Sequence, residues 1–204
     1  MNMQPLSELP PIILASTSAF RKQLLEKLCL PFTTAKPDID ETPLAQESVE
    51  EMVNRLSLAK ANEVANTVKN AIIIASDQSA VFEEKPIGKP HNYENAFNQL
   101  KGFSGQSIAF LTGLVVIDQT RQKTYQSLDI TKVFFRNLSD DDIHNYLMLE
   151  QPFECAGSFK SEGLGITLFE KIESSDPNAL IGLPLIQLTT HLKACGIQLP
   201  YLKT

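Results

Sequence analysis

Several acidic and basic side chains that could take part in phosphate chemistry lie where strands are expected to end. Asp77 follows the apolar run Ala71–Ala75, which is too short for a helix and does not alternate, so it predicts a strand covered on both faces. Ligands bind outside the carboxyl ends of strands in open α/β sheets, which makes Asp77 a candidate for chemistry. Lys89 lies between Gly88 and Pro90, whose stiff backbone would hold its ammonium in place. The plainer alternatives are a turn-capping Asp77 and a solvated Lys89.

Three hydroxyl side chains, Ser16 to Ser18, separate a predicted strand over Ile12–Ala15 from a helical pattern. Hydroxyl donors, free backbone N–H groups and the positive end of a helix dipole together favour a bound anion such as phosphate. Arg21 falls in the first turn, where a cation is mildly unfavourable unless an anion offsets it. Ordinary capping by Ser18 with a solvated Arg21 explains the same residues equally well.

Another group of charged residues could bind a metal ion. Asp38, Asp40 and Glu41 form an acidic loop, and closely spaced carboxylates can hold Mg²⁺ while water and phosphate fill its other positions. A solvated loop is the commoner arrangement. Lys60 interrupts the apolar stripe of a helix expected from a capping box at Ser48 to about residue 69. Its ammonium either snorkels to the surface or reaches a cleft that holds negative charge.

The remaining pattern predicts an α/β fold in which a mixed twisted sheet is flanked by helices. With 204 residues and 43% hydrophobic side chains, the chain can form one domain over 1–204 with two lobes, after an N-terminal tail over 1–11. The expected strands are 12–15, 32–35, 71–75, 79–82, 85–87, 107–118, 123–136 and 166–169. Helices are expected from residue 18, over 48–69, from 92 through 100 with a stop at Gly102, over 139–150 and over 185–195.

Composition excludes several classes of protein. The net charge is -6 and the 18 Lys and Arg residues are scattered, which argues against stable nucleic-acid binding. The longest apolar run, Ile108–Ile117, is far shorter than the roughly 20 residues of a membrane span. Three cysteines without paired spacing and no recognisable leader suggest reduced thiols. We therefore expect a soluble, cytoplasmic protein with no membrane partner, and we assign no function to its cysteines or its three histidines.

These side chains suffice in kind for phosphoryl chemistry, which needs positioning and charge neutralisation more than covalent catalysis. The loop over 155–165 is rich in Gly and Ser and carries Lys160 and Glu162, as ligand-binding loops commonly do. The sequence contains neither a GxxxxGK[ST] loop nor a GxGxxG turn, which argues against the P-loop and dinucleotide-binding classes.

Six segments in order resemble the Maf-like nucleoside triphosphate pyrophosphatases, across nearly the whole chain. They are Leu14-Ala-Ser-Thr-Ser-Ala-Phe-Arg21, Asp40-Glu-Thr42, Leu58-Ala-Lys-Ala61, Ala75-Ser-Asp-Gln78, Gly88-Lys-Pro90 and Ala156-Gly-Ser-Phe-Lys-Ser-Glu-Gly-Leu-Gly165. Taken together these motifs are specific, and they are most similar to the subgroup that acts on 7-methyl-GTP.

The resemblance implies an inosine-triphosphatase-like fold with two lobes around a deep cleft, a divalent cation such as Mg²⁺ or Mn²⁺, and a nucleotide substrate cleaved to monophosphate and diphosphate. It is also compatible with a homodimer. By this likeness Asp77 is the proton acceptor and, with Glu41, a metal ligand. The residues implied around the phosphates are Ser16, Arg21, Lys60 and Lys89, and those implied in substrate choice are Phe20, Gln78 and Glu162.

Two positions depart from the family pattern. Ala19 stands where the family usually has proline, and Phe20 stands where the subgroup usually has tryptophan. The second change puts substrate affinity in question more than reaction type. A different class of function, a non-catalytic regulator of cell division that senses a nucleotide or binds a partner, is the alternative; the retained charged positions favour catalysis.

Overall fold

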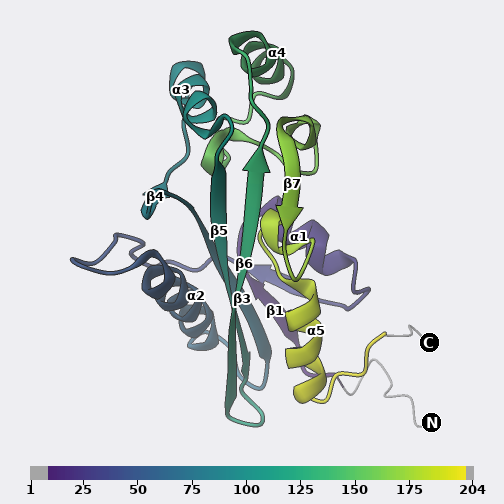
Figure 1. Cartoon of the computed structure of the whole chain (residues 1–204). Helices are drawn as coiled ribbons and strands as arrows, with labels where there is room; N and C mark the ends of the chain where they lie inside the picture. Colours follow the sequence, from purple (N-terminus) through teal and green to yellow (C-terminus); the bar gives the residue numbers. More distant parts are fainter. Residues whose placement is uncertain (1–8, 201–204) are drawn as a thin grey trace.

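A twisted seven-stranded sheet forms the centre of the protein in a computed structural model that describes residues 9–200 (Figure 1). Its strand order is β2-β1-β3-β5-β6-β7, with β4 paired to β3. The strands are β1 Ile12–Ala15, β2 Thr33–Ala35, β3 Ile72–Phe82, β4 Lys85–Ile87, β5 Ser107–Asp118, β6 Lys123–Phe135 and β7 Phe169–Glu173. The helices are α1 Ala19–Glu26, α2 Val49–Ala65, α3 Tyr93–Phe103, α4 Asp140–Glu150 and α5 Leu185–Ala194.

The central strand β3 is longer than the apolar run predicts, and Asp77 lies in its middle. The prediction that the strand ends before Asp77 is therefore wrong. β1 pairs in parallel only with Ile72–Ile74, whereas β5 pairs with β3 as far as Val81. The antiparallel partner carries β3 onward after β1 has ended, because paired backbone groups do not require apolar side chains. A crevice nevertheless opens at the carboxyl end of β1.

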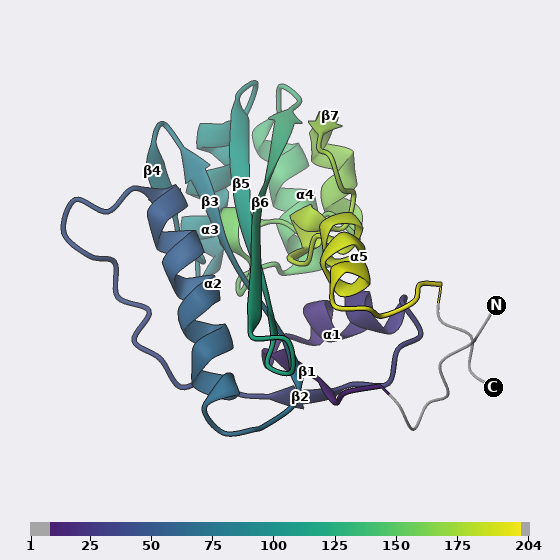
Figure 2. The same cartoon turned by 90° about the horizontal axis from the view of Figure 1, so that it is seen from below.

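Helices cover both faces of the sheet at its β1 end, as Figures 1 and 2 show. Side chains along β3 alternate between these faces. Ile72 and Ile74 pack in a core with residues of α1 and α5, whereas Ile73 packs with Ala61 and Val64 of α2. This burial on both sides explains the unbroken apolar run and confirms that part of the strand prediction.

The opposite end of the sheet has a separate core beneath α3 and α4 (Figure 1). Aromatic side chains dominate this core, and the ring of Phe159 lies edge to face with those of Phe110, Phe135 and Phe169. The long strands β3, β5 and β6 join the two ends. The mixed sheet with flanking helices and two lobes is thus confirmed.

Most predicted elements are present, with differences at their ends. α2 stops at Ala65, and the side-chain amide of Gln119 donates to the carbonyls of Ala65 and Val68, which satisfies backbone acceptors left free after the helix end. α3 continues through Gly102 to Phe103, whose buried ring anchors its last turn.

The strand predicted over 166–169 is mostly wrong. Leu164–Leu168 forms a 3-10 helix, and β7 begins at Phe169. A Cβ at Gly165 would lie 2.3 Å from the carbonyl oxygen of Lys160, so the chain here folds tightly on itself rather than extending.

The structure also bears on the expectations for the cysteines, for membrane-spanning helices and for the N-terminal tail. The three cysteines are free thiols. Within the part of the chain that the structure describes, no helix combines the length and the apolar character needed to cross a membrane. Of the predicted N-terminal tail, residues 1–8 lie outside the described part.

Candidate active site

A cavity of about 580 Å³ lies between the two lobes, with walls formed by loops from both. Residues from the β1–α1 turn, α2, the β4–α3 loop and the loop over 154–162 contribute to it. Eight predicted site residues line the cavity: Ser16, Phe20, Arg21, Glu41, Lys60, Gln78, Lys89 and Glu162. Asp77 is buried and is not in this lining, but its carboxylate contacts Lys60, which is.

Lys60 joins two carboxylates beneath the cavity. Its Nζ lies 2.6 Å from Oδ1 of Asp77 and 2.8 Å from Oε1 of Glu41. Lys60 and Asp77 are buried, whereas Glu41 is exposed. The surface-snorkelling interpretation of Lys60 is therefore wrong. Lys60 lies on the buried stripe of α2 with Leu56 and Val64, so helical spacing directs its side chain inward.

The backbone at Asp77 is held by a buried hydroxyl. The N–H of Asp77 donates to Oγ of Ser57 at 2.9 Å, on the part of β3 that extends beyond β1. This contact requires α2 to approach β5 closely, and Gly113 permits it. A Cβ at Gly113 would lie 2.5 Å from Oγ of Ser57. Oδ2 of Asp77 has no hydrogen-bond partner among residues 9–200, so one oxygen of the carboxylate remains available.

The carboxylates of Asp77 and Glu41 fit a divalent cation. Both reach a single ammonium, so both can reach one small ion at that place. Residues 9–200 contain no cluster of three or more His, Cys, Asp or Glu side chains arranged to hold a metal. A site with two carboxylates and the rest supplied by phosphate and water suits Mg²⁺, which keeps several waters and binds few protein ligands.

The β1–α1 turn brings two serine hydroxyls, which accept backbone N–H groups, and one guanidinium to the cavity. Oγ of Ser18 accepts the N–H of Arg21, so Ser18 caps α1 as expected, and Oγ of Ser16 accepts the N–H of Ser18. The Arg21 side chain is not solvated, since its Nε donates to the carbonyl of Gly182 at 2.9 Å. Burial lowers the pKa of Arg21, an effect that Asp77 and Glu41 oppose, and the guanidinium stays charged at neutral pH.

Gln78 has a defined amide orientation. Its Nε2 donates to the carbonyls of Ala179 and Leu180 at 2.8 and 3.2 Å, and to Oγ1 of Thr112 at 2.8 Å. Carbonyl oxygens can only accept, so the NH₂ group must be on their side. The carbonyl oxygen Oε1 is then the end of the Gln78 amide available to a ligand in the cavity.

Phe20 and Glu162, the two residues implied in recognition of the nucleobase, lie on different segments that line the same cavity. Phe20 is 40% exposed at the start of α1, and Glu162 is exposed in the loop that follows the 3-10 helix Ala156–Ser158. Neither is buried in a core.

Two further lysines that line the cavity, Lys89 and Lys160, differ in how strongly other protein groups hold them. Lys89 is exposed, with Nζ 3.7 Å from Oε2 of Glu154. Lys160, by contrast, donates to the carbonyl oxygen and the carboxylate of Glu150 at 3.0 and 3.3 Å. Of these two cations, Lys89 is the freer to meet a ligand.

Sequence reasoning missed the residues that orient the site. Ser57 and Thr112 are buried hydroxyls, and the segment over 179–182 supplies the carbonyls that hold Arg21 and Gln78. A signal existed for the hydroxyls: Ser57 precedes Lys60 by three positions on one helical face, and Thr112 interrupts an apolar strand. Main-chain acceptors leave no such signal.

A sheet with both parallel and antiparallel strands, and a cavity lined by hydroxyl and charged side chains between two lobes, defines the class of fold. The Ham1 protein of Staphylococcus aureus has a similar fold, with a TM-score of 0.51 and 14% identity over 90% of this chain and 98% of that chain. This likeness concerns the fold alone.

The family follows from the sequence. The chain belongs to the Maf-like protein family, whose model matches residues 11–195. A relative from Hydrogenovibrio crunogenus is 68% identical over 98% of this chain and 100% of its own length, and one from Colwellia psychrerythraea is 56% identical over 91% of this chain and 93% of its own. Both relatives are named 7-methyl-GTP pyrophosphatase.

Proposed function

We propose that this protein hydrolyses 7-methyl-GTP to 7-methyl-GMP and diphosphate. The cluster of Lys60, Asp77 and Glu41 beneath the cavity carries the proposal, because it offers a buried base beside cations for the phosphates. The names of the relatives support the same reaction. In this reaction water adds to phosphorus and the bond between the α and β phosphates breaks.

The cations of the cavity would bind and orient the triphosphate. Arg21, Lys60 and Lys89 line the cavity from the β1–α1 turn, from α2 and from the β4–α3 loop, so a chain of phosphates in the cavity would meet positive charge from three separate elements. The hydroxyl of Ser16 adds a donor at the start of α1. Such positioning and neutralisation of charge is the larger part of phosphoryl-transfer catalysis.

Asp77 would take the proton from the attacking water. Its Oδ1 is paired with Lys60, and Oδ2 can accept a proton while Ser57 holds the backbone still. Glu41 and Asp77 are the residues that would hold Mg²⁺ or Mn²⁺. A bound dication supplies neutralisation of phosphate charge and a more acidic water.

The nucleobase of the substrate would be selected by protein groups of complementary charge. A 7-methylguanine ring carries a positive charge, which favours an aromatic face and a carboxylate near its N–H edge. Phe20 and Glu162 supply these groups from two different segments that line the cavity, and Oε1 of Gln78 adds a hydrogen-bond acceptor. The reaction would remove a modified nucleotide from the cytoplasmic pool.

A turnover screen tests the proposal. Purified protein is incubated with 7-methyl-GTP, GTP, UTP or dTTP and either Mg²⁺ or Mn²⁺, and products are identified by ion-exchange chromatography. We expect 7-methyl-GMP and diphosphate in equal amounts, with 7-methyl-GTP preferred. Release of single phosphate, or binding of nucleotide without turnover, would contradict the proposal, and the second result would support a nucleotide-sensing regulator instead.

A further inference from the structure

The segment between β2 and α2, residues 36–48, carries Glu41 to the cavity with little help from apolar packing. It contains no helix or strand, and of its two large apolar side chains Leu44 is 57% exposed and Ile39 is only half-buried. In Figure 2 this segment passes along the outer side of α2. Something other than burial must therefore hold Glu41 in its place beside Lys60.

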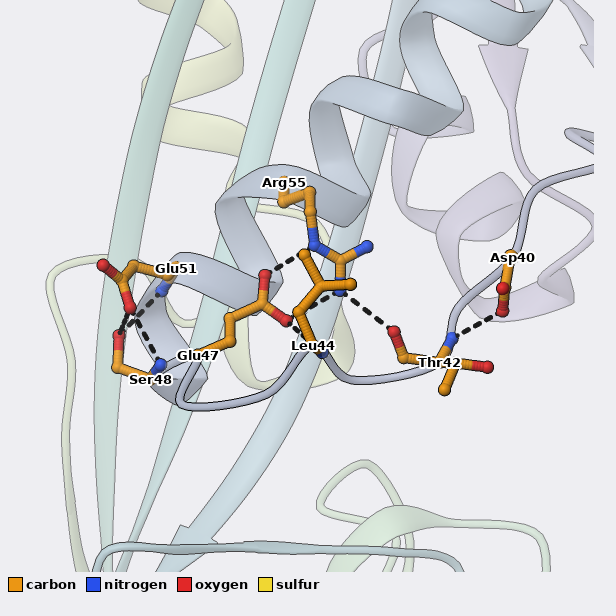
Figure 3. A network of polar contacts seen from close by, with 7 residues as sticks. All are labelled: Asp40, Thr42, Leu44, Glu47, Ser48, Glu51 and Arg55. Atoms are coloured by element: carbon orange, nitrogen blue, oxygen red, sulfur yellow. Dashed lines mark hydrogen bonds and ion pairs between the residues drawn. The ribbon is translucent and has the colours of Figure 1, made fainter.

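A bidentate ion pair provides that hold (Figure 3). Nε and Nη2 of Arg55 donate to the two carboxylate oxygens of Glu47 at 2.5 and 2.7 Å. Nη2 also donates to the carbonyl oxygen of Thr42 at 3.2 Å. Oε2 of Glu47 in turn accepts the N–H of Leu44 at 3.0 Å. One guanidinium therefore ties the segment to α2 at two points, Thr42 and Glu47.

The pair has the geometry of a strong interaction rather than of an incidental surface contact. The side chain of Glu47 is only 7% exposed and that of Arg55 is 29% exposed. Parallel N–H···O bonds from a guanidinium fork are among the stronger charged hydrogen bonds, whereas exposed pairs contribute little. The guanidinium holds the pKa of Glu47 well below its usual range, at about 2, with help from the N–H of Leu44.

The ion pair is positioned to act on Glu41. Thr42, whose carbonyl Arg55 holds, is the next residue in the chain, and the side chain of Asp40 accepts the N–H of Thr42 at 2.9 Å. Arg55 and Lys60 belong to the same helix. Because α2 is one rigid element, fixing Thr42 to Arg55 fixes Glu41 relative to Lys60.

Capping of α2 does not account for this network. The helix already begins with a complete capping box, in which Ser48 accepts the N–H of Glu51 and Glu51 accepts the N–H of Ser48. Neither of these residues contacts Arg55 by a hydrogen bond within residues 9–200. The capping box therefore provides an internal control for the ion pair.

We propose that Arg55 and Glu47 are positioning residues that fasten the segment over 36–48 and so set Glu41 for divalent-cation binding. The inference rests on the proposed function for the role of Glu41. Neither Arg55 nor Glu47 lines the cavity. Loosening it should weaken metal binding more than it slows the chemical step, because Asp77 and Lys60 stay in place.

The test uses Glu47→Gln and Arg55→Lys, with Glu51→Gln as the matched control. Glu51→Gln makes the same change in charge at the same helix end without touching the ion pair. Hydrogen–deuterium exchange of the full-length protein without metal or nucleotide measures the segment directly. We expect exchange over residues 40–47 to quicken about 10-fold in both ion-pair variants, while the end of α2 near Val64 keeps its protection.

Metal binding supplies the second measurement. Titration of Mn²⁺ followed by electron paramagnetic resonance should show about 10-fold weaker binding in both ion-pair variants and near wild-type binding in Glu51→Gln. In turnover, the Mn²⁺ concentration for half-maximal rate should rise by a similar factor while kcat at saturating metal changes less than about 3-fold.

Two results would overturn the inference. Unchanged exchange over 40–47 in both variants would mean that the ion pair does not hold the segment. Faster exchange with unchanged Mn²⁺ affinity, or a wild-type protein that binds no Mn²⁺, would mean that the segment does not position Glu41 for metal. Failure of the proposed function is distinguishable, since it would appear as absent turnover of 7-methyl-GTP with these exchange and binding changes intact.

Discussion

Oδ1 of Asp77 and Nζ of Lys60 lie 2.6 Å apart in the interior, so the candidate base and the neighbouring cation share one buried ion pair. Burying both charges is tolerable only because each compensates the other. The ammonium also bridges to Glu41, where a dication would bind. Lys60 therefore holds the two carboxylates together when no metal is bound. It would also compete with a metal ion for the same carboxylate oxygens.

Asp77→Asn should lower turnover about 100-fold or more, the usual effect of losing a general base. The amide keeps the shape of the carboxylate, and its oxygen can still accept from Lys60, so the fold should survive. Circular dichroism and initial rates measure the two effects. Asp140→Asn, at an exposed residue paired with Lys101, is the control for charge. Activity of Asp77→Asn within a few-fold of wild type would remove Asp77 from the role of base.

Lys60→Met should separate the two functions of the lysine. Removing the ammonium leaves Asp77 and Glu41 to a metal ion without competition, so Mn²⁺ alone should bind more tightly. Turnover should fall about 10-fold or more, because a phosphate contact is lost. Calorimetric titration with Mn²⁺ and initial rates provide the measurements. Weaker Mn²⁺ binding than in wild type would show that Lys60 organises the carboxylates rather than competing for them.

Local patterns explain why so much of the fold was predictable. The run Ala71–Ala75, the capping box at Ser48 and the hairpin turn at Glu83 and Glu84 are each decided by a few neighbouring residues. The length of β3 could not be predicted from neighbouring residues, because the second half of the strand is stabilised by pairing with β5, which is distant in sequence.

The residues of the site could be predicted from the sequence, but the contacts between them could not. Asp77 and Lys60 could be suggested from their types and positions, yet their contact depends on how closely α2 packs against β5. The amide orientation of Gln78 depends on the carbonyls of Ala179 and Leu180, which any residue at those positions would offer. Side-chain types cannot reveal a contact made by main-chain atoms.

Glu162→Gln should reduce the preference for 7-methyl-GTP over UTP much more than it slows hydrolysis, because the amide no longer offsets the charge of the base. Phe20→Trp should lower the KM for 7-methyl-GTP, since tryptophan is the stronger cation–π partner. The measurement is the ratio of kcat/KM values for the two nucleotides. If the ratio of kcat/KM values changes in neither variant, the nucleobase does not bind beside Phe20 and Glu162.

The contribution of Glu47 to stability should depend on acid pH. Its pKa is about 2 in the folded protein, chiefly because of Arg55, against an ordinary value of 4.5. A lowered pKa means stabilisation that is present above about 4.5 and lost as the pH falls toward 2. Urea unfolding of wild type and Glu47→Gln should differ by a constant amount from pH 7 to 5 and converge below pH 4. A difference that persists at pH 2 would contradict this assignment.

Gly113→Ala should damage stability and catalysis together. The added methyl group would lie 2.5 Å from Oγ of Ser57 and 2.9 Å from Cγ1 of Val53, so α2 must move away from the sheet. Overpacking of this kind typically costs about 1–3 kcal/mol. Lys60 lies one turn further along the same helix, so its contact with Asp77 should lengthen and kcat should fall.

Adding Ser57→Ala to Gly113→Ala tests this origin of the damage. The second substitution removes the nearest clashing atom, although by itself it leaves the N–H of Asp77 without a partner, at a cost of about 1–3 kcal/mol. Because the two sites are in contact, the double variant should be less destabilised than the two single effects added together. Thermal unfolding and kcat of all four proteins complete the cycle. Strict additivity would mean that Gly113 does not set the distance of α2 from β5.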